Sequence, residues 1–268
     1  MVVSAGGIGD VQSKRPEVLA IIPARGGSKS IPRKNILPFA GYPLIAYSIA
    51  ASLGSKTITR TIVSTDDSEI ASISRQFGAG VPFLRPAEHS QDATPDFPVF
   101  KHALEWLQDN EGYQPDIIVQ LRPTSPFRRV NHIDEAVRCL SARPDADSIR
   151  TICIPFQNPY KMWRIQSNGL MEPLIRSEFA EAFNMPRQAL PEVYWQTGYV
   201  DAAWSSTVLK KNSMTGERIL PLIIDPSHWI DIDSGDDWRR AERLIENGDI
   251  SFDDLGFYPA NMHNTSSQ

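Results

Sequence analysis

Short apolar runs alternate with amphipathic segments along the first two-thirds of the chain. Runs rich in β-branched residues predict strands over 18–22, 59–64, 81–84, 116–121 and 148–154. Apolar residues at helical spacing predict intervening helices over 43–53, 67–77, 96–109 and 131–140. Pro43 suits the first turn of its helix, and Asp66 or Asp67 suits the N-cap of the next. This alternation predicts the α/β class, as a three-layer sandwich in which helices cover both faces of a mostly parallel sheet.

The alternation stops after the fifth predicted strand. Between 155 and 191 the sequence has turn-forming pairs such as Asn158-Pro159 and scattered aromatic residues, which predict hairpins. Strand patterns return at 198–204 and 219–224, and a closing helix is predicted over 236–247 with Ser234 as a candidate N-cap. We therefore expect one domain over 17–252, with 155–197 as a small β-rich insertion and flexible tails at 1–16 and 259–268.

The composition is typical of a globular protein and argues against several other classes. Of the 268 residues, 41% are apolar and 22% are charged, and the formal net charge is −5. A negative chain is a poor match for a protein that binds nucleic acid through bulk electrostatics. No apolar run approaches the roughly 18 residues that a membrane span needs, and no signal-peptide core follows Met1. Cys139 and Cys153 lack metal-ligand spacing and suit a reducing compartment, so we expect a cytoplasmic protein without nucleic-acid or membrane partners.

The segment after the first predicted strand carries the strongest functional signal. It contains two glycines, a serine and four cations, which are Gly26, Gly27, Ser28, Arg25, Lys29, Arg33 and Lys34. Glycines allow backbone N–H groups to approach a ligand, and the cations favour an anionic one, so the pattern indicates a polyphosphate site. Neither the Walker spacing nor Gly-x-Gly-x-x-Gly is present, so side chains must supply most phosphate contacts. The alternative is a tight turn with solvated charges, and Lys29 and Arg33 are open between the two.

Three charged residues each follow a predicted strand, namely Arg25, Asp66 and Arg122. The carboxyl ends of parallel strands meet at one edge of a sheet, and ligands of such folds bind there. We therefore expect these side chains to lie at the same edge.

Five motifs in a fixed order carry a resemblance to a known family. They are the segment 21–35, Leu84-Arg85-Pro86, Leu-Arg-Pro-Thr-Ser-Pro-Phe-Arg at 121–128, Pro-Arg-Gln-Ala-Leu-Pro at 186–191 and Asp-Ile-Asp-Ser at 231–234. Together they resemble the acylneuraminate cytidylyltransferase (CMP-sialic acid synthetase) family. The resemblance implies a Rossmann-like nucleotide-binding sheet and a dimerisation arm at 155–197, in a homodimer or a dimer of dimers. It also implies a Mg²⁺- or Mn²⁺-dependent enzyme that transfers CMP from CTP to the hydroxyl of an acidic keto-deoxy sugar and releases pyrophosphate.

The resemblance assigns the nucleotide half of the site. Its nucleotide-binding positions are Ala24, Arg25, Gly26, Ser28, Lys34, Asn35, Arg85 and Thr94, and its catalytic positions are Arg25, Lys34 and Asp231. Asp231 and Asp233 are the candidate metal ligands, because residues i and i+2 of an extended segment share a face where two carboxylates repel unless a cation lies between them. Magnesium suits a partial ligand set that phosphate oxygens and water complete. The alternative for this pair is to cap the following helix.

The acceptor half is assigned in the same way to Arg122, Lys161, Arg187, Gln188, Thr197 and Asp201. An arginine fork matches a carboxylate, so Arg187 is expected to grip the sugar acid, unless it forms an ion pair between subunits. The chain departs from the family pattern here, since Arg122 replaces a glutamine, Thr197 an asparagine and Asp201 a tyrosine. We therefore expect an acceptor other than N-acetylneuraminate, such as a legionaminic- or pseudaminic-type acid, a deoxy-octulosonate or a small phosphonate.

Three other functions stay open at this point. The first alternative is a related nucleotidyltransferase that uses GTP. The second is a glycosyltransferase that uses a nucleotide sugar, and the third is a non-catalytic scaffold. A glycosyltransferase needs an Asp-x-Asp pair but has little use for Arg25 and Lys34 around a leaving pyrophosphate. The cations and the paired carboxylates together argue against a scaffold.

Overall fold

A six-stranded sheet forms the centre of the molecule, in the order β10-β6-β9-β5-β1-β4. The computed structural model describes residues 15–255, so the predicted tails lie outside it except for residues 15 and 16. The strands are β1 (Val18–Pro23), β4 (Arg60–Ser64), β5 (Ile117–Gln120), β6 (Ser148–Cys153), β9 (Trp195–Trp204) and β10 (Ile219–Ile223). β9 runs antiparallel to β5 and β6, whereas the pairs β1–β4, β1–β5 and β6–β10 are parallel. The predicted α/β fold with a mostly parallel sheet is confirmed.

Helices cover both faces of this sheet. They are α1 (Leu44–Gly54), α2 (Ser68–Gln76), α3 (Asp96–Glu111), α4 (Val130–Ser141), α5 (Ser205–Leu209), α6 (Gly235–Glu246) and α7 (Phe252–Leu255). Short 3₁₀ turns lie at η1 (Lys34–Ile36), η2 (Ala87–His89), η3 (Pro159–Lys161), η4 (Ala182–Asn184), η5 (Arg187–Ala189) and η6 (Pro226–His228), and a two-stranded ribbon joins β2 (Pro38–Phe39) to β3 (Tyr42–Pro43). Among residues 15–255, no helix combines the length and the apolar character needed to cross a lipid bilayer.

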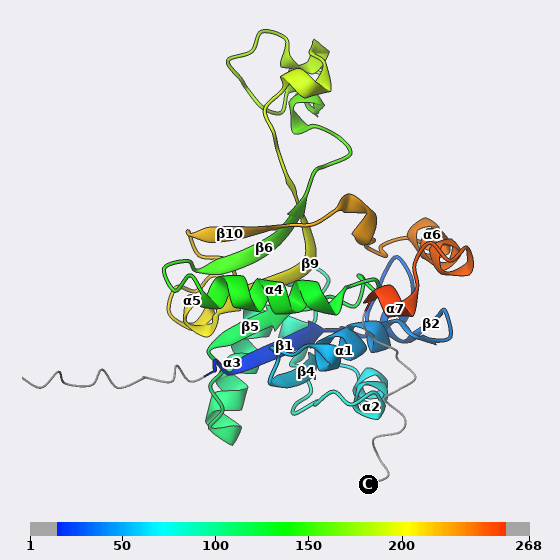
Figure 1. The fold of residues 1–268 in the computed structure, drawn as a ribbon, viewed down its shortest axis with the longest axis vertical. Coiled ribbons are helices and arrows are strands. Elements are labelled where there is room, and N and C mark those ends of the chain that lie inside the picture. Colours follow the sequence, from blue (N-terminus) through cyan, green and yellow to red (C-terminus); the bar gives the residue numbers. More distant parts are fainter. Residues whose placement is uncertain (1–14, 256–268) are drawn as a thin grey trace, which may run out of the picture.

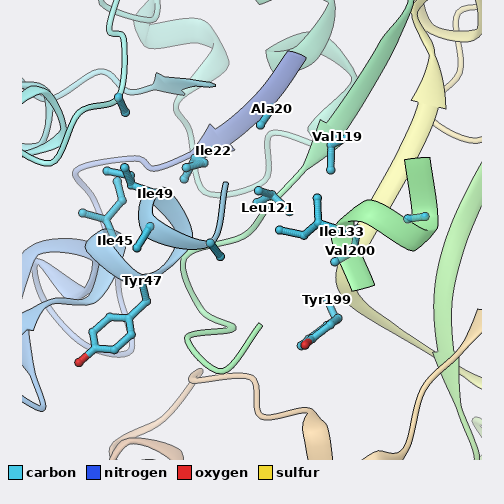
Figure 2. Packing of buried hydrophobic residues seen from close by; sticks show 14 of the residues in the cluster. Ala20, Ile22, Ile45, Tyr47, Ile49, Val119, Leu121, Ile133, Tyr199 and Val200 are labelled. Carbon is cyan, nitrogen blue, oxygen red and sulfur yellow. The ribbon is translucent and has the colours of Figure 1, made fainter. Parts of the chain in front are cut away.

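Alternate residues of β1 enter two separate cores, as the period of a strand requires. Ala20 and Ile22 face α1 and α4, where Ile45, Ile49 and Ile133 pack around them (Figure 2). Leu19 and Ile21 face the opposite side and pack with α3 and α5. The two cores place a rigid sheet between two helical layers, so its carboxyl edge is a fixed platform for side chains.

The helix ends agree closely with the sequence. The side chain of Asp67 caps α2 by accepting hydrogen bonds from the backbone N–H groups of Glu69 and Ile70. Ser234 caps α6, and Asp237 completes a capping box. Pro43 differs by one residue from its predicted place, because it occupies the N-cap position and the helix begins at Leu44.

The prediction of a strand over 81–84 is wrong, because the structure has no strand there. The chain makes only isolated bridges there, Ile62 with Gly80 and Thr65 with Leu84. Pro82 lies between them and has no N–H group to donate to a ladder. Val81 and Phe83 still pack into the two cores, which explains why the pattern of this segment resembled that of a strand.

The segment between β6 and β9 projects away from the sheet as an arm (Figure 1). It contains an antiparallel hairpin of β7 (Trp163–Ile165) and β8 (Met171–Pro173). Several large apolar side chains of the arm are exposed, with Ile165 at 74%, Phe156 at 69% and Leu170 at 65%. Within the described chain, therefore, this hairpin has no apolar partner large enough to bury it.

Candidate active site

A cleft of about 430 Å³ lies where β1, β4 and β5 end. The predicted site residues that line it are Arg25, Ser28, Lys34, Asn35, Arg85, Thr94, Arg122 and Asp233. They come from segments that are widely separated in the sequence. Of the three residues expected at one edge of the sheet, Arg25 and Arg122 line the cleft, whereas Asp66 does not line it and instead accepts a hydrogen bond from the Gly26 N–H. Most of the predicted nucleotide half and one predicted metal ligand also line the cleft.

The loop after β1 is fixed to the end of β4. The Ala24 N–H donates to Ser64 O at 3.0 Å, and the Gly26 N–H donates to the Asp66 carboxylate at 3.0 Å. A Cβ on Gly26 would lie only 2.8 Å from a carboxylate oxygen of Asp67, so this close approach requires glycine. The backbone amides of Ala24 and Gly26, both predicted to serve a nucleotide, are thus engaged within the protein. Ala24 and Gly26 therefore shape the loop, while Arg25 and Ser28 of the same loop line the cleft.

Asp92 pairs with two cations of this loop. The Arg25 Nη1 atom lies 2.6 Å from one oxygen of Asp92, and the Lys29 ammonium bonds to the other. The hydrogen bond from Lys29, followed by that from Arg25, lowers the pKa of Asp92. Arg25 and Lys29 therefore already bind a carboxylate in the cleft, which supports the view that this end of the cleft selects anions.

Lys34 enters the cleft from η1. Arg33 before it adopts a left-handed backbone, with φ 59°, and forms ion pairs with Asp67 and Glu69 at the start of α2. Lys34 is buried, and its Nζ donates to Ile232 O at 2.8 Å and to Asp233 Oδ1 at 3.1 Å. The open question about Arg33 is thereby answered, since it anchors α2 while Lys34 faces Asp233.

The predicted metal pair is divided between two neighbouring cavities. The Asp233 side chain is 72% exposed and faces the cleft, whereas Asp231 lines a cavity of about 100 Å³ beside Trp229. The Oδ1 atom of Asp231 is buried without a hydrogen-bond partner. Burial raises the pKa of Asp231, and a hydrogen bond with Thr124 only partly opposes this. A cation is one group that would satisfy such an oxygen, so the chemistry of Asp231 fits a divalent metal.

The capping alternative for this pair does not hold, because Ser234 and Asp237 cap α6. Across residues 15–255, no group of three or more His, Cys, Asp or Glu side chains is placed to hold a metal. A metal at Asp231 and Asp233 would thus need further oxygens from a ligand or from water, as Mg²⁺ sites commonly do.

Arg122 is the predicted acceptor residue that reaches the cleft. Its Nη2 lies 2.7 Å from Asp96 Oδ2, and its Nη1 lies 3.3 Å from Asp201 and 3.0 Å from Gly198 O. A Cβ on Gly198 would lie 2.4 Å from Arg122 Nη1, and φ there is +66°, so only glycine leaves room for the guanidinium. Asp201 is 2% exposed and lies 2.7 Å from Arg150, inside the sheet. Asp201 therefore forms an ion pair with Arg122 from within the protein and does not itself line the cleft.

The other predicted acceptor residues do not line the cleft of their own chain. Thr197 is buried, and its hydroxyl bonds to Thr151 O and Oγ1 at 3.1 and 2.8 Å. Arg187 and Gln188 line a second cavity of about 500 Å³ at the base of the arm, where Arg187 donates to the carbonyls of Pro155 and Phe156. Lys161 is exposed on the arm. Within one chain the arm residues thus lie apart from the cleft, because the arm leaves the sheet beyond Cys153.

Sequence reasoning missed two residues of this region. Asp96 lines the cleft, but its sequence signal is only that of the first residue of a helix. Arg128 is fully buried, and its guanidinium donates to Tyr199 O, Ser48 Oγ and Arg122 O at 2.6, 2.9 and 2.8 Å. Burial lowers the pKa of Arg128 to about 10. Arg128 is the last residue of the motif at 121–128. Its hydrogen bond to Arg122 O fixes the backbone of Arg122 at the cleft, which explains why the motif includes an arginine at this position.

A family model described as Cytidylyltransferase matches residues 19–210. The chain belongs to the cytidylyltransferase family. This cytidylyltransferase is 32% identical over 230 residues to the CMP-N,N'-diacetyllegionaminic acid synthase of Legionella pneumophila, which covers 85% of this chain and 96% of that protein. It is 43% identical over 119 residues to the pseudaminic acid cytidylyltransferase of Campylobacter jejuni, over 44% of this chain and 50% of that protein. The resemblance derived from the motifs is confirmed.

Solved structures share the fold at low sequence identity. A CMP:2-keto-3-deoxy-manno-octonic acid synthetase complexed with CTP matches with a TM-score of 0.64 at 15% identity, over 87% of this chain and 99% of that chain. A cytidylyltransferase from Leptospira borgpetersenii matches with a TM-score of 0.57 at 17% identity, over 92% of each chain. Both likenesses concern the fold of this cytidylyltransferase alone.

Proposed function

We propose that the protein transfers CMP from CTP to a hydroxyl of an acidic keto-deoxy sugar of the sialic-acid type and releases pyrophosphate. The observation that carries this proposal is the shared cleft, which Arg25, Lys34 and the carboxylate of Asp233 all line, with Lys34 paired to Asp233. Cations together with a carboxylate suit a triphosphate that is bound at its charged end and held through a divalent ion.

In the proposed reaction, the acceptor hydroxyl loses its proton to solvent and its oxygen bonds to the α-phosphorus of CTP. The bond from that phosphorus to the oxygen that bridges it to the β-phosphorus breaks, and pyrophosphate leaves with the electron pair. Such a transfer depends mostly on positioning and on neutralising the charge of the leaving group. Arg25 and Lys34 are the groups that would neutralise the departing pyrophosphate. Asn35 donates to Arg25 O at 3.0 Å, so it holds the loop in this position.

Asp231 and Asp233 would hold Mg²⁺ or Mn²⁺, with phosphate oxygens and water completing the ligand set. When bound, the ion supplies Lewis-acid stabilisation of the charge on the phosphate oxygens. The unsatisfied oxygen of Asp231 and the exposed carboxylate of Asp233 support this assignment.

The acceptor is proposed to be a nonulosonic acid of the legionaminic or pseudaminic kind. Relatives named for these two acids support this class. The planar guanidinium of Arg187 suits the carboxylate of such an acid. Because Arg187 lies on the arm of its own chain, away from the cleft, we propose a homodimer in which one protomer's arm completes the cleft of the other. The exposed apolar residues of the arm support this arrangement.

The test is release of pyrophosphate by the full chain with Mg²⁺, each of the four ribonucleoside triphosphates and a panel of sugar acids. The expected result is turnover with CTP and a nonulosonic acid, and little turnover with GTP. Turnover with GTP alone, or transfer of a sugar from a nucleotide sugar without pyrophosphate release, would overturn the proposal. CTP use and the free thiols of Cys139 and Cys153 favour a cytoplasmic location.

A further inference from the structure

A further cavity, of about 330 Å³, lies at the edge of the sheet opposite the cleft. It is formed by α3, the loop before β5, the end of β9 and α5, and is called the α3–α5 cavity below. Ile117 at the start of β5 pairs with Trp204 at the end of β9, so both strands reach this edge here. The cavity shares no lining residue with the cleft or with the cavity at the base of the arm.

The walls of the α3–α5 cavity are apolar and held in place. Leu104 is 2% exposed and belongs to the core under α3, and Leu209 packs against the same core. The ring of Tyr113 lies under the guanidinium of Arg60, 4.8 Å from its centroid, and Arg60 is itself paired with Glu111 at 2.6 Å. A preformed apolar space of this size suits the hydrocarbon or aromatic part of a small molecule.

Ser205 and Asp116 give this cavity adjacent acceptors. Ser205 is 7% exposed, and its Oγ is buried without a hydrogen-bond partner in the described chain. Its N–H donates to Asp116 O at 2.9 Å, which holds the two residues together. Oδ2 of Asp116 accepts from the Glu17 N–H at 2.9 Å, and no residue among 15–255 donates to Oδ1. A buried hydroxyl without a partner costs free energy, so this pair of oxygens suits an ammonium group of a ligand.

Lys210 brings the opposite charge to the same cavity. It follows α5 directly, five positions after Ser205, and its side chain is exposed. Within residues 15–255, no carboxylate forms an ion pair with its ammonium. The cavity therefore has one cation and one carboxylate on its lining that are not paired with each other. Unpaired opposite charges around an apolar space complement a ligand that carries both charges itself.

We propose that the α3–α5 cavity binds a small zwitterion with an apolar body, which is the chemistry of a free apolar or aromatic amino acid. The ligand carboxylate binds Lys210, its ammonium binds Asp116 and Ser205, and its body lies against the apolar walls. The inference is independent of the proposed function, because the cleft at the other edge of the sheet contributes no residue to it.

Probes that differ only in charge test this inference. The measurement is a ligand-observed NMR titration of the full chain with phenylalanine, leucine and tryptophan, and with 3-phenylpropionate and phenethylamine, which each keep one charge of phenylalanine. At least one amino acid should bind with a dissociation constant of about 1 mM or tighter. Each single-charge analogue should bind at least about threefold more weakly than phenylalanine, since it loses one charged contact. Absence of binding by all three amino acids, or an analogue that binds as well as phenylalanine, would overturn the inference.

The place of binding is tested with CTP and Mg²⁺. Saturating nucleotide should leave the bound amino acid in place, because the cleft and the α3–α5 cavity lie at opposite edges of the sheet. Release of the amino acid by CTP would assign it to the cleft and overturn the inference.

Two variants separate the two charges. Lys210→Gln should weaken phenylalanine at least about threefold and leave phenethylamine unchanged, whereas Asp116→Asn should weaken phenylalanine and leave 3-phenylpropionate unchanged. The amide oxygen of the second variant still accepts from the Glu17 N–H. Lys56→Gln and Asp109→Asn are the matched controls, because both residues are exposed outside this cavity. Equal losses in variants and controls, or no loss in either variant, would contradict the inference. If Asp116→Asn does not fold by circular dichroism, Lys210→Gln alone decides, since its side chain is exposed.

Discussion

Arg122 and Asp201 form an ion pair, with 3.3 Å between Nη1 and Oδ2, although 79 positions separate them in the sequence. Both are positions where the chain departs from the pattern of the family it resembles. The structure shows that the two departures belong together, because a buried carboxylate accompanies the added guanidinium. Asp96 and Gly198 O take up further donors of Arg122. Within the described chain, three oxygen acceptors therefore compensate the guanidinium of Arg122.

Asp201→Ala should destabilise the fold strongly. The substitution leaves Arg122 and Arg150 without their shared carboxylate. Breaking a buried ion pair in this way costs about 3–5 kcal/mol. Urea unfolding at neutral pH measures the loss. The double variant Arg122→Gln/Asp201→Ala should recover part of it, and strict additivity of the two single effects would contradict a direct pairing.

Arg25→Ala should lower turnover at least about a hundredfold, since removal of one charge contact in the transition state typically has this effect. The melting temperature should change little, because Arg25 is partly exposed and its partner Asp92 is also exposed. Arg143→Ala removes another exposed arginine and ion pair outside the cleft and serves as the control. Comparable losses of activity in the two variants would mean that Arg25 has no special role.

Asp233→Asn should raise the Mg²⁺ concentration needed for half-maximal activity, with little effect on folding. The side chain is 72% exposed, so its loss costs little packing, but the amide is a weaker ligand for a hard cation. Activity titrated with MgCl₂ gives the shift. An unchanged metal requirement would remove Asp233 from the proposed metal site.

Asp147 makes stability depend on pH. Hydrogen bonds from Lys211 and from the backbone N–H groups of Glu217 and Arg218 lower the pKa of Asp147 from 3.8 to about 2. Between these values the unfolded chain binds more protons than the folded one, so stability falls as pH falls. Asp147→Asn should therefore be less stable than wild type near neutral pH, and the difference should shrink below about pH 4. Urea midpoints at several pH values provide the check, and a pH-independent difference would contradict this cause.

The arm should control the oligomeric state. Ile165→Glu places a charge on a side chain that is 74% exposed in one chain and, in the proposed dimer, buried against a second copy. Sedimentation should show a dimer for the wild type and a monomer for the variant. Leu53→Glu is the control, since Leu53 is 45% exposed on α1 and lies outside the arm. A monomeric wild-type protein would exclude this assembly.

Much of the fold was predictable because it depends on local patterns. Strands such as β1 and helices such as α3 carry clear periodicity, and Asp67 and Ser234 cap helices as their spacing predicts. The prediction of a strand over 81–84 failed because Pro82 has no N–H group to donate to a neighbouring strand, although the apolar pattern is that of a strand.

The candidate site was predictable where a motif follows a strand, as with Arg25, Lys34 and Arg122. It was not predictable where a role depends on contacts between distant segments. No spacing indicates that Asp201 balances Arg122, or that Arg128 is buried with only neutral partners. Asp96 was missed for the same reason, because its hydrogen-bond donors are Gln120, at the end of β5, and Arg122, in the loop after β5.

The most direct test of the central claim is a crystal structure of the protein with Mg²⁺ and a non-hydrolysable CTP analogue. The account predicts the triphosphate between Arg25 and Lys34 and the metal at Asp231 and Asp233. A nucleotide bound outside this cleft, or bound in it with its phosphates directed away from Arg25 and Lys34, would contradict the account.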